Sequence, residues 1–317
     1  MYTIPPKKMV IINILDILKK YSDMDHRLTQ AQIIEILKKE YYMDVDRRTV
    51  KRNLMNLLDF DFGIDYTEII KKNEKGEEIP ICTDWYITRE FDDSEIRLLI
   101  DSVLFSKTIP QKQCKKLIDK LKGLSNIYFE KKVNHICSLP EIRPENKELF
   151  YTIDVLDEAI SKGKKVSFIY NSYGTDKKLH PKREREYVIN PYQMVATNGR
   201  YYLICNYDKY DTLSNYRIDR ITGIKMMNEK RKSIKELKEG EINLPKHMAE
   251  HLYMFAGESI RVKFKAKNYI IDQIIDWFGF GPKITKQDED TCMVEVEVNE
   301  EAFFHWAMQY GLHIEVL

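Results

Sequence analysis

The segment NPYQMVATNGRYYLICNYDKYDTLSNYRIDR, residues 190–220, carries six tyrosines and three arginines around two short apolar runs. Similar strand-like runs, separated by Gly, Asn and Asp, extend from residue 165 to residue 227. Short runs with this even punctuation predict a small, strongly bent sheet or barrel. Aromatic rings can stack on nucleic-acid bases while guanidinium groups neutralise phosphate, so the segment predicts a surface of that kind.

Two features of this segment also have ordinary structural explanations. Strand alternation in RYYLICNY directs Tyr201 to one face and Tyr202 to the other, so at least one of the two rings is expected in a core. Arg217 and Asp219 share one face of YRIDRI, with Arg220 on the other, and the first two can form a structural ion pair. Both explanations remain open beside ligand binding.

A basic stretch precedes the segment and supports the nucleic-acid hypothesis. Residues 162–185 hold eight basic side chains and two acidic ones, together with Tyr170 and Tyr173. Single strands are held by stacked rings and by cations that follow the backbone.

The first 90 residues have the order of a winged helix-turn-helix domain. Residues 9–21 repeat apolar positions at helical spacing. Thr29 and Gln32 are placed for a capping box at the start of a second helix, and Asp46 for the N-cap of a third. Two strand-like runs, 64–70 and 79–87, then flank a polar loop.

The third helix, RRTVKRNLMNLLDF, separates an apolar face from a polar one. Its apolar side carries Val50, Leu54, Leu57 and Leu58. A recognition helix presents donors near its N-terminus to the major groove. The residues predicted to contact DNA are Arg47, Arg48, Thr49, Lys51, Arg52 and Asn56. A solvated basic face is the alternative, and Lys71, Lys72 and Lys75 of the wing are equally compatible with phosphate contact or a solvated loop.

The remaining parts are helical and mixed. Residues 92–135 show two amphipathic helices, broken at Pro110, that we interpret as a connector. Residues 258–317 alternate strand and helix patterns in the order βαββαβ, which is the ferredoxin-like motif. The predicted fold class is therefore α+β and multidomain.

Composition narrows the function classes. A net charge of +1 provides no global attraction to nucleic acid or membrane. No apolar run is long enough for a membrane span, the N-terminus does not resemble a secretory signal, and five cysteines lack CxxC spacing. These features predict a cytoplasmic protein without a zinc site.

Catalysis is not expected. The chain has neither a glycine-rich phosphate loop nor a GxSxG motif. His247 and His251 in HMAEH have metal-pair spacing, but Met248 stands where a general-base Glu would be, so a surface or packed pair is expected. We therefore predict no enzyme activity, no metal and no cofactor.

The chain resembles the WYL-domain transcriptional regulators. The resemblance lies in GRYYLI followed by YRIDRI after a strand ending in VINP, in the N-terminal RRTVKR, and in the tail, which is similar to the C-terminal extension called WCX. Tyr201 stands where the family pattern has Trp, so stacking there is expected to be weaker. The tail stops at HIEVL, whereas family tails usually continue into another helix.

The resemblance implies an Sm-like β-barrel as the WYL domain, which binds an effector, and a homodimer. The effector-binding residues that it implies are Tyr170, His180, Arg185, Tyr201, Arg217 and Arg220. The expected domains are a winged helix-turn-helix at 1–91, a helical connector at 92–148, the WYL domain at 149–230, a linker helix at 231–257 and the WCX ferredoxin-like domain at 258–317.

These features lead to the hypothesis of a ligand-responsive regulator that binds a duplex DNA operator. Its effector is expected to be short single-stranded nucleic acid or another negatively charged molecule. Two alternatives are a single-stranded RNA- or DNA-binding accessory factor of a defence system and a regulator that senses a small metabolite.

Overall fold

The computed structural model describes residues 7–72, 76–132, 146–238 and 240–317. The chain divides into two compact units, one of residues 1–105 and 111–141, the other of residues 106–110 and 142–317. Within the described ranges, none of the helices combines the length and apolarity needed to cross a bilayer.

Three helices and a ribbon of two strands begin the first unit. The helices are α1 (Val10–Tyr21), α2 (Gln30–Tyr41) and α3 (Arg47–Asp59). The predicted capping box is present, since Thr29 and Gln32 bond reciprocally, and Asp46 accepts from the Thr49 N–H as the predicted N-cap of α3. The shared core contains apolar side chains from all three helices and the ribbon, including Ile14, Leu18, Ile33, Leu37, Val50, Leu54, Leu57 and Trp85.

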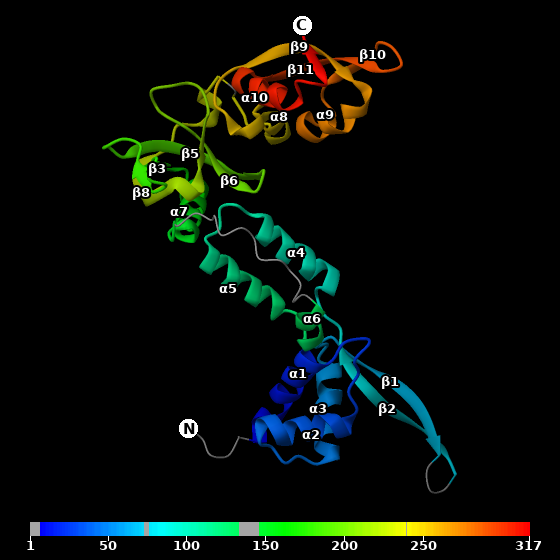
Figure 1. The fold of residues 1–317 in the computed structure, drawn as a ribbon. Coiled ribbons are helices and arrows are strands. Elements are labelled where there is room, and N and C mark those ends of the chain that lie inside the picture. The colour runs from blue at the N-terminus through cyan, green and yellow to red at the C-terminus, as the bar shows by residue number, and fades with distance from the viewer. Residues whose placement is uncertain (1–6, 73–75, 133–145, 239) are drawn as a thin grey trace. The chain divides into compact units, whose positions relative to one another are not determined.

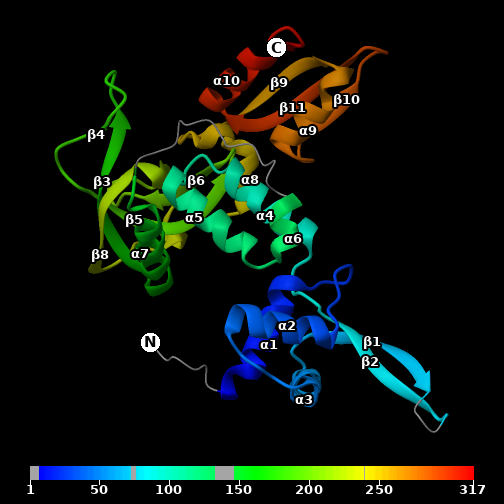
Figure 2. The same cartoon turned by 60° about the horizontal axis from the view of Figure 1, so that its bottom comes forward.

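The ribbon consists of β1 (Ile64–Lys72) and β2 (Glu78–Ile87), paired antiparallel. Its end next to the helices is anchored because Ile64, Trp85 and Ile87 are buried. Its far end extends away from the helices in both views (Figures 1 and 2), and Ile70 and Ile79 there are exposed.

The same unit contains α4 (Asp93–Phe105), α5 (Gln111–Lys122) and α6 (Ile127–Lys132). The interruption expected at Pro110 is present, since α4 ends before it and α5 begins after it. Ile96, Ile100 and Phe129 form a small core. Residues 106–110, inside the predicted connector, belong to the second unit, where the Lys107 N–H donates to the Gly199 carbonyl.

The second unit begins with α7 (Leu149–Lys162) and a curled antiparallel sheet. The strands are β3 (Lys164–Tyr173), β4 (Leu179–Pro181), β5 (Tyr187–Thr197), β6 (Arg200–Asn206), β7 (Ser214–Arg217) and β8 (Ile221–Lys230). Their order is β4-β3-β5-β6-β7, and β8 pairs with β3. YRIDRI is not one continuous strand, because a 3-10 turn over Ile218–Arg220 separates β7 from β8.

Strand β6 is buried on both faces. Leu203 and Cys205 belong to one core, with Tyr201 packed partly against it, whereas Tyr202 and Ile204 belong to another. The alternation predicted for RYYLICNY is therefore confirmed, and Tyr202 is a core residue.

The rest of the unit contains α8 (Leu244–Glu250) and a second antiparallel sheet. Its elements are β9 (Ser259–Lys267), α9 (Ile271–Phe278), β10 (Lys283–Lys286), β11 (Thr291–Asn299), α10 (Glu300–Tyr310) and β12 (Ile314–Val316) (Figure 1). This is the βαββαβ element order that the sequence predicts, with strand order β10-β11-β9-β12. Phe264 and Val294 of the sheet pack with Ile274 of α9 and Trp306 of α10.

Candidate nucleic-acid interface

The outer face of α3 presents a set of donors to solvent. Arg48, Lys51, Arg52 and Asn56 are exposed, whereas Val50 and Leu54 on the opposite side are fully buried. Arg47 is oriented from the neighbouring helix, because its Nε donates to Gln30 Oε1 at 3.0 Å. The face therefore has the division between core and donors that a groove-reading helix requires.

Thr49 differs from the other predicted DNA contacts. Its hydroxyl donates to Asp46 Oδ2 at 2.7 Å, and its N–H donates to Asp46 Oδ1 at 2.9 Å. These bonds, the side-chain one first, hold the pKa of Asp46 below its usual range. The Thr49 hydroxyl therefore contributes to the cap of α3.

The ribbon adds cations near its tip. Lys71 and Lys72 are exposed at the end of β1, and Lys75 lies outside the described residues. Glu77 and Glu78 are exposed beside them, so the tip is not uniformly basic.

In the second unit, Arg217 is engaged by a carboxylate. Its Nε and Nη2 donate to the two oxygens of Asp219 at 3.0 and 2.6 Å. The Asp219 side chain is 1% exposed and that of Arg217 is 14% exposed. This is the structural ion pair that the sequence left open, so Arg217 is largely neutralised.

Arg220, unlike Arg217, has no carboxylate partner among the described residues. Its Nε is buried without a hydrogen-bond partner, and its guanidinium makes no ion pair with any residue that the structure describes. It lies close to two buried tyrosines: burial raises the pKa of Tyr170 and of Tyr202, and the charge of Arg220 opposes both shifts. A half-buried guanidinium without a counter-charge is unfavourable unless an anion joins it.

Tyr170 connects the two arginines to the aromatic core. Its hydroxyl accepts from the Arg217 N–H at 3.3 Å, and its ring meets that of Tyr216 edge to face at 4.8 Å. The structure therefore brings Tyr170, Arg217 and Arg220 together, and it adds Tyr202, which is not among the effector residues implied by the sequence.

The other three predicted effector residues make no hydrogen bond or ion pair with this cluster among the described residues, although Tyr201 packs against the core that contains Tyr170. Tyr201 lies on the opposite face of β6, where burial, followed by the charge of Asp157, raises its pKa. The His180 ring is exposed and pairs with Asp176 at 2.9 Å. Arg185 is exposed in the turn before β5.

An open cavity of about 310 Å³ adjoins the backbone of Arg220. It is lined by Asn146, Lys147, Glu148, Asn171, Leu179 and Thr222. Asn171 Nδ2 donates to the Arg220 carbonyl at 3.0 Å and to Thr222 Oγ1 at 2.9 Å. The cavity thus lies beside the backbone of Arg220, and its lining includes one basic residue, Lys147, and one acidic residue, Glu148.

Sequence reasoning missed a second aromatic cluster in the same sheet. The Arg183 guanidinium lies 3.3 Å from the Tyr187 ring centre, and its Nη2 donates to Tyr207 Oη at 3.1 Å. Tyr216 Oη donates to Tyr207 Oη at 3.2 Å. The only signal in the sequence was the abundance of rings and cations, because these partners are separated by up to 33 residues.

Comparisons with known proteins identify part of the chain. Residues 151–226 match the family model described as the WYL domain. This range contains Tyr170, Arg217 and Arg220 as well as the aromatic cluster around Arg183.

Among solved structures, the chain is similar to proteasome accessory factor B/C (PafBC) of Arthrobacter aurescens, with a TM-score of 0.32 and 11% identity. The match covers 100% of this chain and 49% of that one, so the chain spans about half the length of PafBC. No curated protein matched.

The predicted histidine pair lies beyond the WYL domain. The His247 and His251 rings are 4.3 Å apart, and His251 Nδ1 is 2.9 Å from the Phe255 carbonyl. His247 Nε2 is buried without a partner. In the described part of the chain, no group of three or more His, Cys, Asp or Glu is arranged to hold a metal.

His247 makes the stability of this region dependent on pH. Burial, and then His251, lower its pKa from 6.5 to about 4. Between those values the unfolded chain binds the proton and the folded chain does not, so stability falls as pH falls. We expect urea unfolding at pH 5 to show a loss of about 1–2 kcal/mol relative to pH 7. His247→Gln should remove most of this difference, whereas His180→Gln, at an exposed site, should retain it; an unchanged pH dependence in His247→Gln contradicts the assignment.

Proposed function

We propose that this chain is a ligand-responsive transcriptional regulator. Residues 1–91 act as a winged helix-turn-helix that binds duplex operator DNA through α3, and the WYL domain at 149–230 binds an effector. Residues 92–148 connect them, a linker helix occupies 231–257, and residues 258–317 form the WCX ferredoxin-like domain. The regulator acts as a homodimer in the cytoplasm and has no catalytic role.

The observation that carries this proposal is that the chain has two separate cationic sites: an exposed face of α3 and a half-buried arginine in the WYL domain. The exposed face of α3 offers Arg48 and Arg52, and an Arg side chain can make two hydrogen bonds to the edge of a guanine. The WYL domain offers Arg220, which lacks a described counter-charge and lies beside two tyrosine hydroxyls. A duplex fits the first site, and an anion with planar rings, such as short single-stranded nucleic acid, fits the second.

For regulation, the effector must bind one arrangement of the regulator better than another. A ligand that neutralises Arg220 removes an unfavourable buried charge, and this gain is available only in arrangements where the ligand can reach the guanidinium. The Arg217–Asp219 pair would keep the backbone beside Arg220 in place during binding.

Sensing of a small metabolite is the second candidate. The cavity beside Arg220 has about 310 Å³, close to the lower end of small-molecule sites. Lys147 and Glu148 would suit a ligand that carries both charges. The salt dependence of effector affinity distinguishes the two candidates. Binding of single-stranded nucleic acid weakens steeply as salt rises, whereas binding of a metabolite weakens much less.

Arg220→Ala tests the effector site. We expect affinity for a 12-nucleotide oligo(dT) to fall roughly 10-fold or more, because a charge-assisted contact to phosphate is lost. Binding to duplex DNA should be unchanged. Fluorescence anisotropy measures both, and circular dichroism confirms folding. Lys230→Ala is the control, since it removes one exposed positive charge from β8 of the same domain. Equal loss in both variants would assign the effect to overall charge and refute the site.

A further inference from the structure

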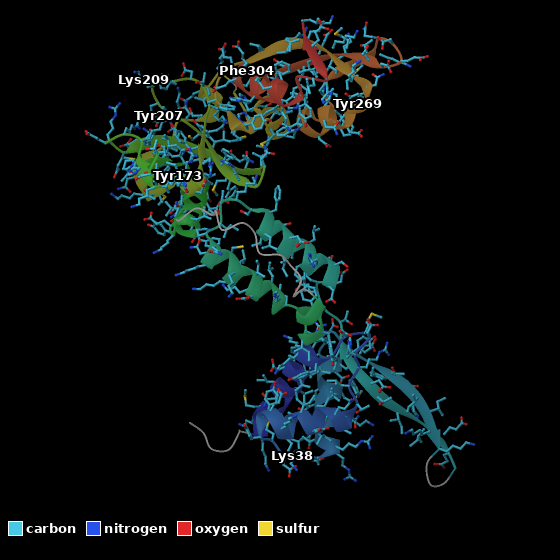
Figure 3. All side chains as sticks on the ribbon, in the orientation of Figure 1. Lys38, Tyr173, Tyr207, Lys209, Tyr269 and Phe304 are labelled. Atoms are coloured by element: carbon cyan, nitrogen blue, oxygen red, sulfur yellow. The ribbon has the colours of Figure 1, made fainter. Side chains whose placement is uncertain are left out.

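The loop that joins β6 to β7, residues 207–213, presents a ring and a cation to solvent. Tyr210 is 55% exposed, and Lys209 is exposed with its Nζ 5.6 Å from the Tyr210 ring centre. Figure 3 shows Tyr207 and Lys209 on this loop. The Tyr210 ring is therefore accessible to a planar ligand.

The loop is built to hold this position. Asn206, which is fully buried, donates from Nδ2 to the carbonyls of Tyr210 and Thr212 at 2.7 and 2.9 Å. Buried Asn190 donates from Nδ2 to Asp208 Oδ1 at 2.8 Å. Asn206 therefore fixes the backbone of the loop, and Asn190 fixes the Asp208 side chain beside Lys209, so little entropy is lost when a ligand binds there.

The acidic residues of the loop are already neutralised. Asp208 accepts from Lys165 Nζ at 2.6 Å, and Asp211 accepts from Lys232 Nζ at 2.7 Å. Hydrogen bonds from Asn190, and then from Lys165, hold the pKa of Asp208 below its usual range. Lys209 has no ion-pair partner among the described residues, so the outer side of the loop presents an available positive charge.

A second cation, Arg183, contacts Tyr207, whose ring packs against that of Tyr210. Arg183 contacts Tyr207 through its Nη2, and the Tyr207 ring meets that of Tyr210 edge to face at 6.4 Å. Arg183 Nε is buried without a partner, and none of the described carboxylates pairs with this guanidinium. An exposed ring, a fixed loop and two cations without a carboxylate partner among the described residues are the parts of a platform for a nucleotide unit.

We propose that Tyr210, with Lys209 and Arg183, is a second contact point for single-stranded nucleic acid, outside the Arg220 cluster. A base stacks on the exposed Tyr210 ring, and its phosphate lies toward Lys209. This inference deepens the proposed function and rests on it for the ligand class. The loop does not line the cavity beside Arg220, and Tyr210 is exposed, so one nucleotide would bind weakly. The platform suits a single strand that adds this contact to another.

The test uses the full chain with Arg48→Ala and Arg52→Ala, so that α3 contributes little to binding. Anisotropy of a labelled 12-nucleotide oligo(dT) is measured from about 50 to 300 mM salt. We expect Tyr210→Ala to lower affinity about 5-fold to 100-fold, corresponding to the loss of one stacked base. Tyr210→Phe should retain most of the affinity because the ring remains. Lys209→Ala should reduce the slope of log K against log salt by about 0.7.

Matched controls separate this site from general surface effects. Tyr151→Ala removes a ring with 58% exposure from α7 of the same domain, and Lys230→Ala removes an exposed lysine from β8. Neither should change affinity more than twofold. If Tyr210→Ala binds like the parent while Arg220→Ala is impaired, the platform is refuted and the effector site stands. If Tyr210→Ala is impaired and Arg220→Ala is not, the platform stands and the Arg220 site fails. If the parent binds no oligonucleotide, both lose their ligand, and duplex binding by α3 is judged separately.

Discussion

Simultaneous replacement of Arg48 and Arg52 by Ala is expected to weaken binding to operator DNA by roughly 100-fold or more. Each bidentate contact from Arg to a guanine edge contributes about 1–3 kcal/mol of discrimination, and both guanidinium groups lie on the exposed face of α3. Fold stability should be unaffected, because the helix is held by Val50, Leu54 and Leu57 on the opposite side.

The operator is obtained by selecting duplexes from a random pool with the parent protein, and affinity is measured by anisotropy at fixed salt. The control is the double variant Lys38→Ala and Lys39→Ala, which removes the same charge from the end of α2; Lys38 is labelled in Figure 3. We expect at most a few-fold loss for the control. Comparable losses in the two double variants would show that α3 supplies charge without reading sequence.

Among the single substitutions considered, Asp219→Ala is expected to lower the free energy of unfolding the most. It leaves Arg217, whose side chain is 14% exposed, without its bidentate partner, and breaking a buried pair from one side costs about 3–5 kcal/mol. The thermal unfolding midpoint of the second unit should therefore fall by several degrees. Differential scanning calorimetry measures it, and Asp176→Ala, which breaks the exposed pair with His180, should change stability by less than about 1 kcal/mol.

A double replacement tests the reason for that loss. Asp219→Leu combined with Arg217→Met removes both charges and retains comparable volume, so it should recover much of the stability. If the double variant is as unstable as Asp219→Ala, the loss arises from packing and the ion pair is not its cause.

Local signals in the sequence predicted the helical parts well. The capping box at Thr29 and the N-cap at Asp46 depend on side chains within three residues of each other, so a linear pattern contains all the information needed. The two-faced burial of β6 was likewise predictable, because strand alternation is a local property.

The candidate effector site was harder to predict. The pairing of Arg217 with Asp219 was recognised as one possibility, but its burial depends on strands distant in the chain. A 3-10 turn over Ile218–Arg220 interrupts the strand that the sequence pattern predicts there, so strand alternation does not apply to Arg220. The contact between Arg183 and Tyr207 depends on sheet closure, so no local spacing indicates it.

The WYL family model matches residues 151–226 only. The proposal that the N-terminal residues bind DNA depends on the geometry of α3 and the ribbon. The roles of α3, of Arg220 and of the 207–213 loop can be tested separately, since each has variants that leave the other two intact.

The most direct test of the central claim is a titration of operator binding with single-stranded oligo(dT) in the parent protein and in Arg220→Ala. In an effector-responsive regulator, saturating oligonucleotide should change the operator Kd of the parent at least about 5-fold, in either direction, and leave that of Arg220→Ala unchanged. An operator Kd that is the same with and without bound oligonucleotide in the parent would contradict effector sensing by the WYL domain.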